Sequence, residues 1–219
     1  MTTEQVIALC RAHGTGAVSD ALDLLGRNGG AEGLARQSGH GVIAGPAYTL
    51  RYEPVEAGEL APAGEFIDDV PAGAVVVVDN GGRTHCTVWG NILSEVARRR
   101  GIAGTVIDGA CRDAGETREL GYSLWSRATF MKSGKNRVRL VAVQEPVSLG
   151  GTKVAPGDLV CADDSGVIVV PAELSGPAAE KIAQVTRMEA AVLDDIARGV
   201  PLAQARRAHG YNFPVPAQG

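Results

Sequence analysis

Apolar and polar residues alternate along the chain with two periods, and together these predict an α/β protein. Uninterrupted apolar runs occupy Ala74–Asp79 and Gly104–Asp108, a pattern typical of strands that are covered on both faces. Between them, Trp89–Arg100 carries apolar residues at helical spacing, and Gly101 follows as a stop signal. The middle of the chain therefore predicts a strand, a helix and a second strand.

Helices are also expected nearer both ends of the chain. Thr3 offers an N-cap for a short helix that ends at Gly14–Gly16, and a second helix is expected over Ala17–Leu25. Glu65–Val70 predicts a short helix before a Pro-Ala-Gly turn. The segment Ala172–Arg198 predicts a long amphipathic helix near the C-terminus.

Further strands are expected on either side of the central segment. Gly41–Arg51 and Leu124–Ser126 predict strands, and from Arg137 onward the pattern becomes that of a β-meander with a hairpin signal at Gly150-Gly151. The apolar segments are spread evenly, so we expect residues 1–219 to form one domain. The expected fold is α/β, a mixed sheet flanked by helices with a C-terminal helix.

Composition and charge narrow the possible partners. The net charge of −4 gives no electrostatic case for binding nucleic acid, which requires a basic face. No stretch approaches the length of a membrane span and the N-terminus lacks a signal-peptide pattern, so the cytoplasm is the expected location. The cysteines are far apart and without zinc-site spacing, which predicts reduced thiols at Cys10, Cys86, Cys111 and Cys161.

Candidate chemistry is concentrated where the strand GTVID runs into the loop GACRD. Sites in α/β folds collect beyond the carboxyl ends of strands. Arg112 offers a fork of donors that matches a carboxylate, and Asp113 offers a hard oxygen for Mg²⁺ or Mn²⁺. An exposed charge pair on a loop is the alternative reading. Asp108, just before Gly109, is expected to orient the Arg112 loop from behind.

A second candidate element follows the strand VVVVD, where the chain enters a helix. The first N–H groups of a helix have no intrahelical partner and lie at its positive dipole end, so they can seat an anion. The alternative is that these residues only begin and cap the helix. The candidate anion-binding residues are Gly90, Asn91, Ile92 and Leu93.

These segments, in this order and spacing, resemble the RraA-like family, which includes 4-hydroxy-4-methyl-2-oxoglutarate and 4-carboxy-4-hydroxy-2-oxoadipate aldolases. The similarity extends over nearly the whole chain. It includes SDALDLLG, AGPAYTLR, ARRRGIAGTVIDGACRD, LGYSLWSRA and PVSLGGTKVAPGDLVCADDSGVIVVP. The resemblance implies a compact αββα-type domain similar to the swivelling phosphohistidine domains. It also implies a homotrimer or homohexamer with sites between subunits.

The resemblance also implies roles for individual residues. Asp113 corresponds to the ligand of Mg²⁺ or Mn²⁺, and Arg112 to the group that contacts the pyruvyl part of the substrate. Glu189 resembles an acid that reaches the metal site of a neighbouring subunit. Where the aldolases carry a second acid, this chain has Asn91, whose amide adds no negative charge and should weaken metal binding.

The function implied is that of a metal-dependent class II pyruvate aldolase or oxaloacetate decarboxylase. Such a lyase cleaves a 4-hydroxy-2-oxo diacid or decarboxylates oxaloacetate through a pyruvate enolate. No lysine lies in the GACRD loop for a Schiff base, which favours the metal-dependent route. The alternative is a weakly active or inactive regulatory binding protein, similar to the family members that inhibit ribonuclease E. A methyltransferase is disfavoured because no nucleotide-binding fingerprint is present.

Overall fold

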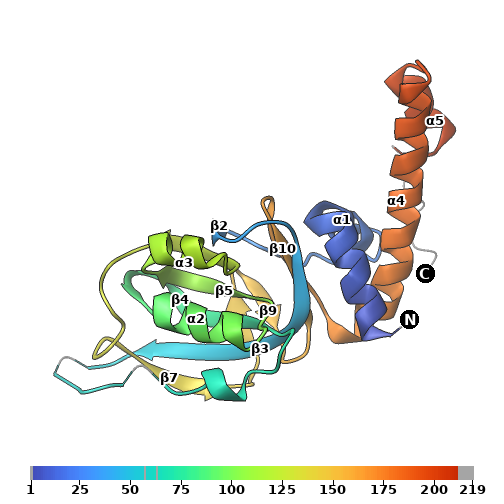
Figure 1. Cartoon of the computed structure of the whole chain (residues 1–219). Coiled ribbons are helices and arrows are strands. Elements are labelled where there is room, and N and C mark those ends of the chain that lie inside the picture. Colours follow the sequence, from blue (N-terminus) through green and yellow to red (C-terminus); the bar gives the residue numbers. More distant parts are fainter. Residues whose placement is uncertain (1, 57, 63, 212–219) are drawn as a thin grey trace.

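The computed structural model describes residues 2–56, 58–62 and 64–211 of the 219-residue chain. It shows a mixed α/β fold with a C-terminal helix, as the sequence predicts (Figure 1). The helices are α1 (Thr3–Asp23), α2 (Asn91–Arg99), α3 (Ala114–Leu120), α4 (Ser175–Ala197) and α5 (Leu202–Ala208), with 3-10 turns η1 (Ile67–Asp69) and η2 (Ala172–Leu174). The strands are β1 (Gly30–Ala31), β2 (Ala35–Ser38), β3 (Ile43–Pro54), β4 (Val75–Thr87), β5 (Gly104–Cys111), β6 (Leu124–Thr129), β7 (Val138–Val143), β8 (Val147–Leu149), β9 (Thr152–Val154), β10 (Leu159–Asp163) and β11 (Gly166–Val170).

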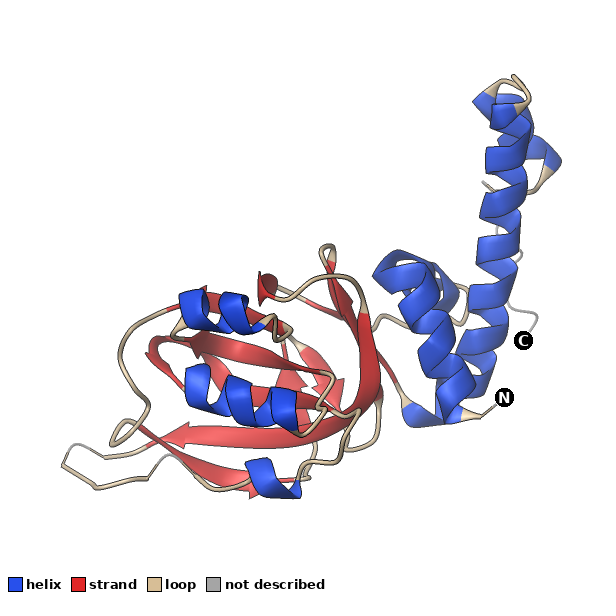
Figure 2. Ribbon diagram, viewed as in Figure 1, coloured by secondary structure: helices blue, strands red, loops and turns tan. Residues whose placement is uncertain are grey.

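The sheet is mixed, which confirms the expected class. Within the described residues its strand order is β1-β11-β10-β3-β4-β5-β6-β2, with β7 paired to β3, and β8 and β9 form a separate hairpin. The four strands β3, β4, β5 and β6 run parallel to one another, and the remaining pairings are antiparallel. Because α2 and α3 connect parallel neighbours, the carboxyl ends of β4 and β5 lie at the same edge (Figure 2).

Both faces of the central strands are covered, which confirms the interpretation of the uninterrupted apolar runs. On one face, Val76 and Val78 of β4 pack in a core with α2 and η1. On the other, Val75 and Val77 pack in a second core with the β8–β9 hairpin and β10 and β11. All eight residues of β5 are buried. Burial of this kind contributes about 1.5 to 3 kcal/mol for each fully buried valine.

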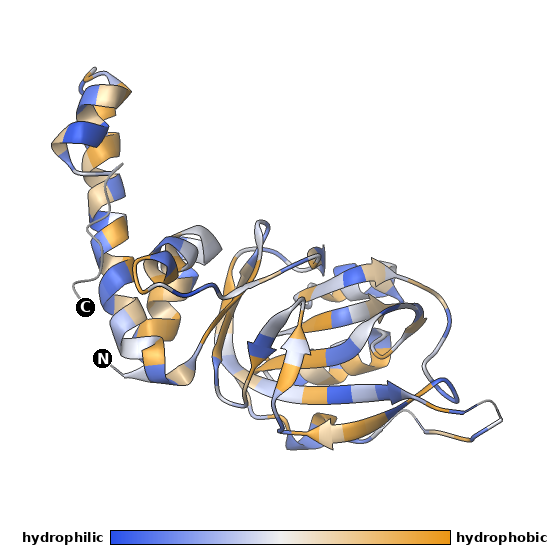
Figure 3. Cartoon of the chain, turned by 180° about the vertical axis from the view of Figure 1, so that it is seen from behind, coloured by the Kyte–Doolittle hydropathy of each residue, from blue (hydrophilic) through white to orange (hydrophobic). Residues whose placement is uncertain are grey.

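A third core joins α1 and α4 to strands β10 and β11. The two helices lie side by side at one end of the sheet, and α4 continues beyond α1 as an arm that carries α5 (Figure 1). Apolar residues mark the strands and the contact between α1 and α4 (Figure 3). The arm also exposes apolar side chains, with Leu193 65% and Ile196 41% exposed. The long amphipathic helix that the sequence predicts is therefore present, but only its first half packs against the body.

The N-terminal prediction needs one correction. The N-cap is Thr2 instead of Thr3, because the Thr2 hydroxyl accepts from the backbone N–H of Gln5 while the Gln5 side chain accepts from the Thr2 N–H. The two helices expected on either side of Gly14–Gly16 are both present, as the two halves of α1, and Gly14 separates them with a non-helical φ of 76° and ψ of −179°. The helix resumes directly after the kink because Asp163 caps its second half.

Other boundaries also differ from the sequence prediction. The expected helix over Glu65–Val70 is the three-residue 3-10 turn η1, since it is too short to sustain α-helical hydrogen bonding. The strand expected at Ala74–Asp79 continues as β4 through a polar segment to Thr87. The extension pairs with β5 across two register shifts, and hydrophobic periodicity does not predict such shifts.

None of the helices in the described part of the chain is long and apolar enough to cross a membrane.

Asp163, in the turn between β10 and β11, anchors the kink of α1. Its Oδ2 accepts from the Thr15 N–H at 2.8 Å, and its Oδ1 accepts from the Thr15 hydroxyl at 2.7 Å and from Ser165 N–H at 2.8 Å. Burial opposes ionisation of this carboxyl, but the hydrogen bonds outweigh it and lower the pKa of Asp163 below its usual value. The turn between β10 and β11 thus caps the second half of α1.

Asp163→Ala should therefore lower the free energy of unfolding by about 2 kcal/mol at pH 7, since it removes a charged cap. The folded pKa is depressed, so the stabilisation is present above the unfolded-state pKa of about 3.9 and is lost as pH falls through the folded pKa. Urea unfolding from pH 7 to pH 3 measures both effects. Asp164→Ala is the control, because Asp164 lies in the same turn, is 88% exposed and pairs with Arg36 instead of with α1. Equal losses in the two variants would contradict the capping role.

Candidate functional site

The predicted site residues come together at the carboxyl ends of β4 and β5. β4 leads through Trp89 and Gly90 into α2, and β5 leads through Arg112 and Asp113 into α3. The two connections are tied together by the Arg112 N–H, which donates to the carbonyl of Trp89 at 2.9 Å. Asp113 adopts the left-handed conformation, with φ 55° and ψ 37°, and this sharp corner turns the chain into α3.

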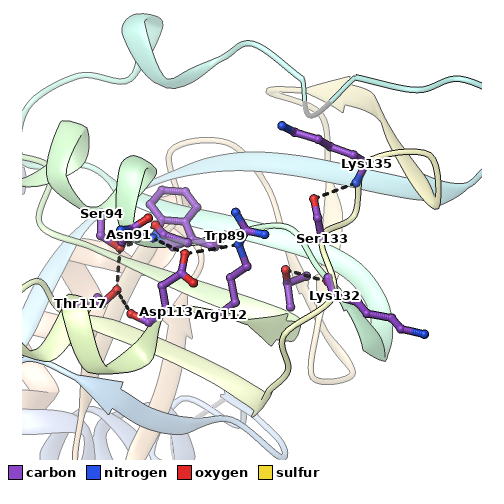
Figure 4. A network of polar contacts seen from close by, with 11 residues as sticks. Trp89, Asn91, Ser94, Arg112, Asp113, Thr117, Lys132, Ser133 and Lys135 are labelled. Carbon is purple, nitrogen blue, oxygen red and sulfur yellow. Dashed lines mark hydrogen bonds and ion pairs between the residues drawn. The ribbon is translucent and has the colours of Figure 1, made fainter.

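Asp113 links its neighbour Arg112 to the start of α2 (Figure 4). Its Oδ2 accepts from the backbone N–H of Asn91 at 3.2 Å and lies 3.3 Å from Nε of Arg112. The Arg112 side chain is 38% exposed and that of Asp113 28%, so both are open to a small ligand. Across the described residues, no hydrogen bond is made to the other oxygen, Oδ1. One carboxylate oxygen is therefore held in place and the other is available.

The N-terminus of α2 forms the adjoining wall of the site. Its N-cap residue, Gly90, is extended and provides no side-chain cap, and the first helical bond runs from Ser94 N–H to the Gly90 carbonyl. The N–H groups of Ile92 and Leu93 therefore lack intrahelical partners at the positive end of the helix dipole. This geometry suits an anion, as the sequence predicts for Gly90 to Leu93.

A ladder of polar side chains beneath the site fixes α2 against α3. The buried Trp89 indole donates to the Ser94 hydroxyl at 3.0 Å, and Ser94 lies 3.3 Å from the hydroxyl of Thr117. Thr117 in turn donates through its hydroxyl and its N–H to the carbonyl of Asp113, each at 3.0 Å. Sequence reasoning missed Ser94 and Thr117. The sequence did hold a sign of their role: each is a hydroxyl residue on the buried face of its helix, where an apolar residue is usual.

A small pocket of about 220 Å³ opens beside these groups. Arg112 and Lys135 are its charged lining residues, and no Asp or Glu belongs to its described lining. Burial raises the pKa of the Tyr52 hydroxyl at one side of the pocket, so this group stays protonated near neutral pH. The lining comprises Tyr52, Gly64, Thr87, Val88, Trp89, Gly90, Asn91, Ile92, Leu93, Arg112, Ser133, Gly134, Lys135 and Val138. Two cations and a helix N-terminus give this pocket a positive character that suits a small anion.

Two other predicted residues lie elsewhere. Asp108 was expected to orient the Arg112 loop, but its carboxylate accepts from the Gly150 N–H at 2.9 Å and pairs with Arg127. The cause is strand alternation, which places Asp108 on the face of β5 that meets the β8–β9 hairpin. Glu189 lies on α4, in the arm that extends away from the body (Figure 1). A role for Glu189 at a site of this kind therefore requires a second subunit.

The donor set around Asp113 suits a cation that retains water ligands. No group of three or more His, Cys, Asp or Glu side chains that could hold a metal occurs among the described residues. Mg²⁺ needs fewer protein ligands than that, because it is commonly bound through one or two carboxylates, waters and substrate oxygens. The available Oδ1 of Asp113 fits this requirement, and the Asn91 side chain could hydrogen-bond a water on such an ion.

Comparison with known proteins identifies relatives of the chain. Residues 15–169 match the family model described as Aldolase/RraA. Protein DlpA of Legionella pneumophila is 40% identical over 199 residues, 90% of this chain, although the chain spans only 32% of DlpA. A Burkholderia multivorans protein provisionally named 4-hydroxy-4-methyl-2-oxoglutarate aldolase is 33% identical over 167 residues, which cover 76% of this chain and 96% of that one.

A solved structure extends the similarity to the fold. Streptomyces coelicolor RraAS2, described as an unusual member of the RNase ES inhibitor RraA protein family, superposes with a TM-score of 0.77 and 28% identity. The superposition covers 90% of this chain and 98% of that one. The family-model match covers well over half of the sequence and contains the Arg112-Asp113 corner and the start of α2. The chain belongs to the RraA-like family.

Proposed function

We propose that the chain is a divalent-metal-dependent lyase that cleaves a carbon–carbon bond of a small 2-oxo acid. The proposed reactions are retro-aldol cleavage of a 4-hydroxy-2-oxo diacid and decarboxylation of oxaloacetate, both of which give pyruvate. The observation that carries the proposal is the pairing of Arg112 with Asp113 beside the open N-terminus of α2. The names of relatives such as the Burkholderia multivorans protein point to the same chemistry.

The substrate carboxylate is assigned to the start of α2. The N–H groups of Ile92 and Leu93 are unpaired within the helix, and both residues line the pocket. A carboxylate there gains charge-assisted hydrogen bonds and the favourable field of the helix dipole. With its carboxylate bound there, a 2-oxo acid has its 2-oxo group beside Arg112.

Arg112 is assigned to the charge that develops during bond cleavage. Its Nε faces Asp113, while within the described residues its Nη groups make no hydrogen bond. Cleavage places negative charge on the 2-oxo oxygen as the pyruvate enolate forms, and a fixed guanidinium stabilises such charge. A divalent cation on Asp113 would act as a Lewis acid toward the same oxygen.

A regulatory binding protein is the second candidate function. Asn91 provides an amide where the resembling aldolases have an acid, and the described residues contain no larger cluster of metal ligands. The structural similarity to RraAS2, from a family named for RNase ES inhibition, supports the same alternative. The two candidates differ in turnover, so a direct assay separates them.

The first test is pyruvate release from oxaloacetate and from 4-hydroxy-4-methyl-2-oxoglutarate, coupled to lactate dehydrogenase. We expect release with Mg²⁺ or Mn²⁺ and its loss in chelator. Arg112→Ala should lower kcat/KM by at least about 100-fold, because it removes a preorganised charge at the developing enolate. Arg98→Ala is the matched control, since Arg98 pairs with Glu95 at the far end of α2. No release from either substrate with either metal would reject the lyase and favour the binding protein.

Gly90→Ala should impair the site without unfolding the chain. A Cβ at position 90 would lie 2.7 Å from Asp113 Oδ2 and 3.2 Å from Arg112 Nε, so both side chains must move. Because small displacements of catalytic groups are costly, we expect kcat/KM to fall by about 100-fold. Gly115→Ala in α3 has no atom within 4 Å of its new Cβ and serves as the control. A wild-type rate in Gly90→Ala would contradict the close approach.

Asn91→Asp should tighten metal binding by roughly tenfold, because a carboxylate holds a metal ligand or its water more strongly than an amide. Mn²⁺ binding measured by electron paramagnetic resonance checks this without relying on activity. Asn91→Ala is the companion variant and should bind Mn²⁺ no more tightly than the natural chain. If all three proteins have the same Mn²⁺ affinity, the metal does not lie beside α2.

A further inference from the structure

The pocket carries a second cation opposite the α2 wall. Lys135 lines the cavity together with Ser133 and Gly134, on the loop between β6 and β7. Figure 4 shows its side chain extending from that loop toward the side of Trp89 and Arg112, whereas Lys132 extends away. Within the described part of the chain, the Lys135 ammonium makes no hydrogen bond or ion pair. It is available to a ligand that enters the pocket.

The loop that carries Lys135 is fixed to the end of β4. The carbonyl of Lys132 accepts from the N–H of Thr87 at 3.0 Å and from its hydroxyl at 3.1 Å. The Gly134 N–H donates to the carbonyl of Thr87 at 2.7 Å, and a Cβ on Gly134 would lie 2.7 Å from that same oxygen. Glycine is therefore required for the loop to lie this close to β4.

A second set of contacts holds the other side of the loop. The Asn136 N–H donates to the Ala61 carbonyl at 3.0 Å, and the Ala61 N–H donates to the Asn136 side chain at 2.9 Å. The Arg137 guanidinium donates to the carbonyl of Lys135 at 3.2 Å. The backbone of Lys135 is thus held by its neighbours while its ammonium remains free. A lysine presented in this way can select among ligands at little additional cost in backbone ordering.

We propose that Lys135 determines substrate specificity by binding the second carboxylate of the substrate, so that the site prefers dianionic 2-oxo acids. The inference rests on the proposed function, in which the first carboxylate lies at the start of α2 beside Arg112. The cavity of about 220 Å³ suits a small acid, and its described lining offers no carboxylate that would repel a second negative charge. A partly exposed charge pair of this kind alters affinity by about fivefold to tenfold.

The test compares two five-carbon probes that differ only in the terminal carboxylate, 2-oxoglutarate and 2-oxopentanoate. Their dissociation constants are measured by calorimetry with Mg²⁺ present. The natural chain should bind 2-oxoglutarate about fivefold to tenfold more tightly. Lys135→Met should abolish this preference by weakening 2-oxoglutarate alone, and Lys135→Arg should retain most of it. Lys132→Met removes a lysine of the same loop that points away from the pocket, and it should behave as the natural chain.

The outcomes separate this inference from the proposed reaction. An equal preference in Lys135→Met and the natural chain, an equal loss in Lys132→Met, or no binding of either acid would overturn the role of Lys135. A preference that depends on Lys135, found in a protein that releases no pyruvate from any substrate, would instead reject the lyase and leave the dianion site in place. Loss of kcat/KM for 4-hydroxy-4-methyl-2-oxoglutarate in Lys135→Met, with folding intact, would support both.

Discussion

β4 and β5 run side by side in the same direction, so the two connections that leave them emerge at one edge of the sheet. That parallel pairing is what the site depends on. It places the start of α2 against the corner that precedes α3, and the hydrogen bond from Arg112 N–H to the Trp89 carbonyl fixes their separation. Residues more than 20 positions apart in sequence then lie together in a single corner.

The corner is rigid because of what lies beneath it. Trp89, Ser94 and Thr117 form a buried chain of hydrogen bonds that ends at the carbonyl of Asp113. Buried polar groups must be satisfied, so this chain specifies one relative position of α2 and α3. Asp113 itself has a backbone conformation that is uncommon for a residue other than glycine, and the surrounding contacts hold it there.

The distribution of charge gives the pocket its chemical character. Arg112 and Lys135 lie on different elements, α2 contributes the positive end of its dipole, and the carboxylate of Asp113 is held at the edge with one oxygen available. If a divalent ion binds at Asp113 as proposed, its protein ligands are few, and oxygens of the anionic ligand would complete its coordination. Asn91 would contribute no negative charge to that site.

By itself, the sequence determined the class of the fold, the buried central strands, the long C-terminal helix and the candidate residues Arg112, Asp113 and Gly90 to Leu93. These follow from local periodicity and residue chemistry, which the chain encodes over short distances. Their proximity was an expectation, based on where two strands of the predicted sheet should end. The family resemblance supplied the roles attached to them, and the model match over residues 15–169 confirms the family.

The tertiary structure alone decided the contacts that depend on strand pairing and on which face each side chain occupies. It assigned Asp108 to the β8–β9 hairpin because the face of β5 follows from register, and it continued α1 past Gly14 because Asp163, 149 positions later, caps the break. It also placed Lys135 on the rim of the pocket through the contacts of its loop with Thr87 and Ala61. Long-range pairing of this kind leaves no local periodicity in the sequence, so only the folded chain reveals it.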